Sequence, residues 1–174
     1  PARWSLRRGC KAMKAPFLFS LLCLGAASAT SAAPRGPAAP IYGVTLPRHY
    51  RAWRLIGAAQ ETGALDELRA VLGNRKALAA YRSGRLPFPD GTVLVKLAWK
   101  REKSQEFAPA FVPGAAITVQ VMVKDTRRYA STGGWGFGRF INGRPADETQ
   151  HKTCFACHQA RAQGHDFVFT RLAA

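Results

Sequence analysis

The chain has few acidic residues, with 10 Asp and Glu against 26 Lys and Arg among its 174 residues, and its formal net charge is +16. The basic side chains are scattered, and no recognised nucleic-acid-binding motif joins them, so we expect no nucleic-acid partner. A charge of this sign favours either a solvated basic surface or a docking face for an acidic partner protein.

The chain also lacks an apolar run long enough to span a bilayer, which takes about 20 residues. Its longest run, residues 15–24, follows a basic stretch without acids and precedes a series of small residues. This order is typical of a cleavable secretory signal. We predict a signal peptide over residues 1–33, with translation starting at Met13 and cleavage after Ala29 or near Ala32. The mature protein is then expected in the periplasm, with no transmembrane segment.

Cysteine is scarce, with only four in the chain. Cys10 and Cys23 lie in the predicted signal, and Leu22 before Cys23 is bulkier than a lipoprotein signal tolerates. The mature chain keeps Cys154 and Cys157, which we do not predict to form a disulfide. Without a structural disulfide, a single domain of this size must be stabilised by its core.

These two cysteines belong to the sequence Cys154-Phe155-Ala156-Cys157-His158, the C-x-x-C-H pattern of c-type haem attachment. Two thiols at this spacing can each form a thioether with one of the two porphyrin vinyl groups. The next residue, His158, can then serve as the proximal ligand of the iron. We therefore predict a covalent haem c held by Cys154, Cys157 and His158.

Two other chemistries use C-x-x-C. A zinc site needs two more ligands at ligand spacing, and the sequence has no second C-x-x-C and no H-x3-H. A dithiol redox motif usually follows an early strand, whereas this one lies near the C-terminal end. Both remain alternatives to haem.

Local signals divide the mature chain into a flexible leader, 34–46, and one haem domain, 47–174. Pro47 predicts the start of a helix through Trp53 and Ile56. The stretch 65–72 fits a helix or a strand equally well. Asn74 predicts a capped helix that ends at Gly84. A tight loop is expected over 87–91.

Alternating or continuous apolar residues predict strands at 93–99, 117–123 and 134–141, and a last strand at 166–172. The predicted fold class is therefore α+β, a predominantly antiparallel sheet with a few short helices and a covalent haem near the C-terminus. This differs from the all-helical folds of most small c-type cytochromes.

Six segments, taken in order, resemble the cytochrome P-460 and cytochrome c′-beta family. The resemblance covers residues 47–172, and the matching segments are 49–53, 88–96, 123–128, 134–137, 154–158 and 167–171. It implies a β-rich homodimer whose five-coordinate haem is open on its distal face. Members bind nitric oxide, and some oxidise hydroxylamine.

The resemblance gives Lys96 a special role, because in cytochrome P-460 a lysine at the end of this G-T-V-x-V-K run is bonded to the porphyrin edge. A buried lysine without a partner is costly, so Lys96 needs an explanation. The alternatives are a lysine on an edge strand or a stem that reaches water.

Arg69 lies where the family places a distal arginine, and it is the second catalytic candidate; a surface arginine is the alternative.

The sixth iron position separates two functional hypotheses. The first is an open iron that binds nitric oxide or a related small nitrogen ligand. If the iron also oxidises hydroxylamine, the protein is an enzyme, and the sequence does not decide this. The second is a six-coordinate electron-transfer cytochrome that docks a redox partner protein. Met122 and the histidines His49, His151 and His165 are the available sixth ligands, and we expect His151 and His165 to be exposed.

Two further sets of residues are candidates for supporting roles. Hydroxylamine oxidation would need a proton acceptor near the iron, for which Asp147 and Glu148 precede the motif. Trp135 and Phe137 are expected to line the haem or to pack in the core.

Overall fold

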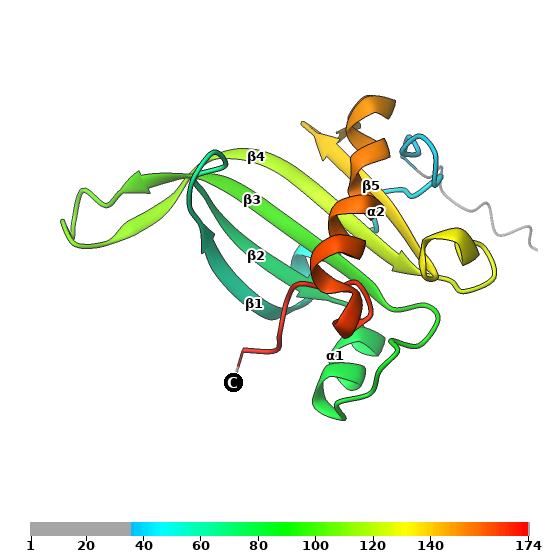
Figure 1. Ribbon diagram of the computed structural model, residues 1–174. Coiled ribbons are helices and arrows are strands. Elements are labelled where there is room, and N and C mark those ends of the chain that lie inside the picture. The colour runs from blue at the N-terminus through cyan, green and yellow to red at the C-terminus, as the bar shows by residue number, and fades with distance from the viewer. Residues whose placement is uncertain (1–35, 174) are drawn as a thin grey trace, which may run out of the picture. The chain divides into compact units, whose positions relative to one another are not determined.

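The strands of the domain form one six-stranded antiparallel sheet whose spatial order follows the chain order, β1 to β6 (Figure 1). The computed structural model describes residues 36–173. The strands are β1 (Arg54–Glu61), β2 (Glu67–Gly73), β3 (Val93–Lys103), β4 (Phe111–Lys124), β5 (Trp135–Ile141) and β6 (Arg144–Pro145). The helices are α1 (Arg75–Arg82) and α2 (Glu148–Ala162), with 3-10 turns at Tyr50–Ala52, Ala130–Thr132 and Gln163–His165. The predicted α+β class is confirmed.

Helix α2 crosses one face of this sheet, running over β5 and the neighbouring strands toward α1 (Figure 1). Because side chains alternate along a strand, the pairing register assigns Arg69, Lys96, Gln120 and Phe137 to this face. We call it the α2 face. The opposite face carries the alternate residues and is almost entirely apolar.

The opposite face is covered by the segment that precedes β1. Ala39 and Val44 are 2% and 3% exposed and pack with Val95, Val121 and Phe140 of the sheet. Residues 39–46, which we predicted to belong to a flexible leader, are therefore folded onto the domain. Short backbone bonds such as Ala39 N–H to the Val44 carbonyl, 2.7 Å, shape the segment.

The helix predicted from Pro47 is wrong: after one 3-10 turn the chain enters β1. Trp53 packs against the opposite-face core, while Ile56 belongs to the core under α2. A register shift between Leu55 and Gly57 breaks the two-residue period of the strand at this point. Pairing with β2 thus overrides a spacing that resembled a helix. The ambiguous stretch at 65–72 is resolved as β2.

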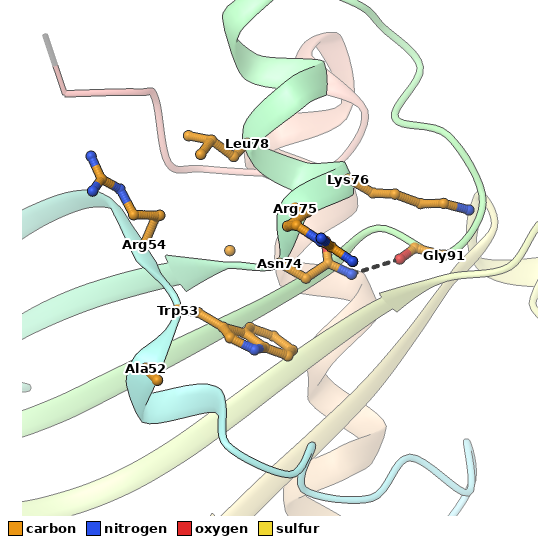
Figure 2. A pocket seen from close by; sticks show the side chains of 9 residues that line it. Ala52, Trp53, Arg54, Asn74, Arg75, Lys76, Leu78 and Gly91 are labelled. Atoms are coloured by element: carbon orange, nitrogen blue, oxygen red, sulfur yellow. Dashed lines mark hydrogen bonds between the residues drawn. The ribbon is translucent and has the colours of Figure 1, made fainter.

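Helix α1 has the cap that the sequence predicts. The Asn74 side chain accepts a 2.9 Å hydrogen bond from the Ala77 N–H, and its amide donates to the Gly91 carbonyl, also 2.9 Å (Figure 2). Asn74 therefore joins the helix to the loop before β3, where the tight turn was expected. The strands predicted at 93–99 and 117–123 are confirmed as parts of β3 and β4, and the one predicted at 134–141 is confirmed as β5, which begins one residue later.

The strand predicted at 166–172 is wrong. Asp166 and Phe167 have φ angles of +50° and +63°, in the left-handed region and far from the extended conformation of a regular strand. The segment after them runs along α1 and β1 and is held by single bonds, from Tyr81 Oη to the Thr170 carbonyl and from Ala173 N–H to the Ile56 carbonyl. Its apolar residues pack without pairing in the sheet.

We predict that Asn74→Ala lowers the free energy of unfolding by about 1–2 kcal/mol, near the upper end for a lost N-cap, because the bond to Gly91 is lost as well. Urea denaturation followed by circular dichroism measures this loss. The exposed Arg82→Ala, on the same helix, is the control and is expected to change little. Equal stability of the two variants would contradict the role of the cap.

Candidate haem site

The C-x-x-C-H motif lies on α2, a helix whose start is fixed by local chemistry. The Asp147 carboxylate accepts a 2.8 Å bond from the Gln150 N–H, which caps the helix and lowers the pKa of that carboxyl group. Residues three and four apart share a face of a helix. Cys154, Cys157 and His158 therefore project from one side of α2.

His158 is held by a hydrogen bond that leaves one ring nitrogen free. Its Nδ1 lies 2.7 Å from the Phe167 carbonyl oxygen. A carbonyl can only accept, so Nδ1 carries the proton and donates, and Nε2 keeps its lone pair. Aromatic rings flank the imidazole, with centroids 5.0 Å away for Phe137 and 4.8 Å for Phe169. This is the arrangement that an imidazole ligand to a metal requires.

Burial favours the neutral forms of two groups in the motif. It lowers the pKa of His158, against the raising effect of the bond to the Phe167 carbonyl, and the Lys96 charge lowers it further. Burial likewise raises the pKa of the Cys154 thiol, and nearby Arg139 partly opposes this. Cys157 is exposed, and both thiols are free.

His151 lies two helical turns before His158 and is fully buried, so the prediction that it is exposed is wrong. The Arg139 N–H donates to its Nε2 at 3.0 Å, and its Nδ1 donates to the Asp147 carbonyl at 2.8 Å. Both ring nitrogens are engaged. His151 therefore anchors α2 to β5 and has no lone pair left for a metal. His165 is half-buried, with Nδ1 bonded to the Val168 carbonyl.

Lys96 lies on β3, between β2 and β4, so the interpretation as an edge-strand lysine is wrong. Its side chain is 19% exposed and forms an ion pair with Glu67, a buried carboxylate on the same face of β2. The contact is not aligned as a hydrogen bond, so Glu67 Oε1 accepts none. Glu67, which sequence reasoning missed, is the partner that a lysine in this position needs.

Arg69 shares the α2 face with Lys96 and Glu67. It pairs across the strands with Glu61 of β1, and both side chains are about one-third exposed or less. The structure therefore brings both catalytic candidates, Lys96 and Arg69, to one face of the sheet. Each of them has a carboxylate partner there.

The aromatic candidates and Met122 belong to the core under α2. Trp135 is fully buried, and its ring lies 5.0 Å from the Lys124 ammonium. Phe137 contacts the His158 ring directly. Met122 pairs with Phe137 in the register and is half-buried beside the same core.

The two acidic residues that precede the motif have structural roles. Asp147 caps α2, and Glu148 forms an exposed ion pair with Lys152 one turn along. Glu148 is ten residues before His158, which is about 15 Å along a helix. Neither is placed to accept a proton near His158.

The residues present fit a haem. Two free thiols and an imidazole with a free Nε2 share one helix face, and the apolar Phe169 beside them is 42% exposed. Arg139 Nε is buried without a partner, and its charge acts on Cys154, so it can pair with a carboxylate such as a propionate. Among residues 36–173, no three His, Cys, Asp or Glu side chains form a group able to hold a metal ion by themselves.

A pocket of the domain lies at the start of α1, between Trp53 and Lys76, and includes none of the motif residues (Figure 2). No helix within the described residues combines the length and hydrophobicity needed to cross a membrane.

An antiparallel sheet covered by one helix, with a haem-attachment motif on that helix, defines a cytochrome of α+β architecture. The chain belongs to the cytochrome P460 family, whose model matches residues 47–170. Membership of this cytochrome family makes haem its cofactor. A search of curated proteins found no match.

We predict that His151→Ala lowers the free energy of unfolding by about 2–4 kcal/mol, because it leaves the Arg139 N–H unpaired and opens a cavity. Chemical denaturation of the haem-loaded protein measures the loss. Gln159→Ala, an exposed change on the same helix, is the control. A change in the ligand-field bands of the iron would instead show that His151 is an iron ligand.

Proposed function

We propose that the protein is an exported mono-haem cytochrome that binds nitric oxide or a related small nitrogen ligand at an open iron. Cys154 and Cys157 hold the haem through thioethers, and His158 is the proximal ligand. The observation that carries the proposal is the hydrogen bond between His158 Nδ1 and the Phe167 carbonyl, because it leaves Nε2 free for the iron.

His151 and Met122 support an open sixth position. His151 has both ring nitrogens engaged in hydrogen bonds within the protein. Met122 packs beside Phe137, whose ring contacts His158, so it lies on the proximal side. A six-coordinate electron carrier normally fills the sixth position with Met or His.

The haem supplies a redox-active iron that binds small ligands, and the chain supplies the surroundings. His158 gives the iron an imidazole whose basicity is raised by the carbonyl behind it. Arg69 carries a fixed fan of N–H donors on the α2 face and can hydrogen-bond a ligand on the iron. Phe137 and Phe169 flank the His158 imidazole with aromatic rings.

We predict a high-spin spectrum for the reduced, matured protein and a shift of its Soret band on addition of nitric oxide. Met122→Leu keeps the side-chain volume and is expected to leave both the spectrum and the shift unchanged. Absorption spectroscopy under anaerobic conditions is the measurement. A low-spin reduced spectrum that nitric oxide does not change would favour the electron-transfer alternative instead.

A second candidate function, hydroxylamine oxidation, is favoured by the pairing of Lys96 with Glu67. A bond from Lys96 Nζ to a porphyrin-edge carbon replaces one N–H and one C–H bond and releases two protons and two electrons, which a peroxide oxidant would take up to form water. The step also requires the neutral amine, and Glu67 is placed to accept the proton from Lys96 Nζ. The buried carboxylate is also the acidic group of the α2 face nearest to Lys96. This makes Glu67, rather than Asp147 or Glu148, the candidate proton acceptor.

We predict that a haem peptide from the matured protein contains Lys96 linked to the porphyrin, and that trypsin does not cut after this residue. Lys96→Arg preserves the charge opposite Glu67 and is expected to lose the link. Lys100→Arg, an exposed neighbour on β3, is the control. Mass spectrometry decides, and quantitative cleavage after Lys96 in the native protein would exclude the bond.

The same proposal places the protein in the periplasm, after removal of the predicted signal at 1–33, a segment outside the described residues. It also includes assembly as a homodimer and a redox partner protein that docks on the basic surface. The basic composition supports the docking, and the family resemblance supports the dimer.

A further inference from the structure

The carbonyl that orients His158 belongs to a backbone segment in an unfavourable conformation. Asp166 and Phe167 are successive non-glycine residues with positive φ. Such residues persist only where the surroundings hold them. Two sets of contacts hold the segment that carries the Phe167 carbonyl: a buried ion pair and the packing of the Phe167 ring.

A buried ion pair holds this segment to the sheet. Lys124, at the end of β4, is 2% exposed, and its ammonium donates to Asp166 Oδ1 at 2.7 Å, to Asp166 Oδ2 at 2.8 Å and to the Gly133 carbonyl at 2.9 Å. These three acceptors match the three N–H groups of a lysine. Asp166 Oδ2 also accepts a 2.8 Å bond from the Phe88 N–H.

The Phe167 ring is fixed from the other side. It packs against Phe155 of α2, with centroids 5.4 Å apart. It also lies over Gly133, where an added Cβ would approach Phe167 Cε2 to 2.1 Å. Only glycine leaves this space open, and the φ of Gly133 is itself +63°.

We propose that Lys124 and Asp166 are positioning residues for the proximal histidine. Together with Gly133, they set the Phe167 carbonyl, and through it the orientation and basicity of the His158 imidazole. The inference rests on the proposed function, in which His158 is the ligand of the iron, and it assigns to Lys124, the last residue of β4, a role in tuning that ligand.

The cost of the ion pair supports a role beyond stability. Removing a lysine and a carboxylate from water costs several kcal/mol per ion, and apolar residues of similar size often serve stability as well. A buried pair can instead specify one arrangement. Here the arrangement is a backbone turn with left-handed residues that aims one carbonyl at one ring nitrogen.

The test uses the full chain matured with haem, in two variants that disturb the segment in different ways. Lys124→Met removes the ammonium, and Gly133→Ala pushes the Phe167 ring while leaving the ion pair. Val121→Ala, fully buried on the opposite face, is the control for a plain loss of packing. Haem content is measured first, then the ferrous iron–histidine stretching frequency by resonance Raman, the reduction potential and the thermal midpoint.

We expect Lys124→Met and Gly133→Ala to lower the stretching frequency and raise the potential, because a weaker bond to the carbonyl makes the imidazole less basic. Val121→Ala is expected to lower the thermal midpoint alone. The proposal is overturned if both variants lose only thermal stability. If Lys124→Met fails to fold, Gly133→Ala decides alone. A native protein without haem overturns the proposed function and this inference with it, whereas unchanged spectra with full haem overturn only the inference.

Discussion

The site depends on the hydrogen bond between His158 Nδ1–H and the Phe167 carbonyl, 2.7 Å long. An imidazole has two nitrogens, and a metal can use either, so a helix that carries a histidine does not by itself present a defined ligand. Because a backbone carbonyl only accepts, it fixes the tautomer and directs Nε2 away from itself. The carbonyl lies nine residues after His158, beyond the end of α2. The orientation of His158, the proposed proximal ligand, is therefore set by the segment after the helix as much as by the motif.

The two faces of the sheet have different chemistry, and this difference separates stability from function. The opposite face packs Val95, Val121 and Phe140 under the N-terminal segment, as an ordinary core does. The α2 face has an apolar core of its own but also carries the Lys96–Glu67 pair. Burying charge costs free energy, so a face chosen only for stability would be apolar throughout. Polar groups beneath α2 are expected where a face must also supply donors and proton acceptors to a ligand.

Sequence patterns predicted those parts of the fold in which local signals agreed with the tertiary structure. The alternating residues of β4 and the Asn74 cap are examples, since pleat and capping act within a few residues. The pattern failed at β1, where a register shift at Ile56 breaks the alternation and leaves a spacing similar to that of a helix. The pattern failed again at 166–172, because the apolar residues there resemble a strand and the sequence does not show that Asp166 is bonded to Lys124.

The residues of the site also divide into those that a local sequence pattern predicts and those that only the folded chain reveals. The proposed haem-binding set of Cys154, Cys157 and His158 can be predicted from the sequence, because its chemistry depends on spacing within five residues. Glu67 and His151 cannot, because their roles depend on partners that only the folded sheet brings close. A signal was nevertheless present for Lys124: a lysine that follows the alternating residues of a strand, on the face that becomes buried, needs a counter-ion. The sequence alone offers ten Asp and Glu residues as possible counter-ions, and the fold selects Asp166, 42 residues away. The bond to Lys124 holds the segment after α2 in a turn with two left-handed residues, in place of a strand. It thereby ties the backbone that orients His158 to the far end of β4.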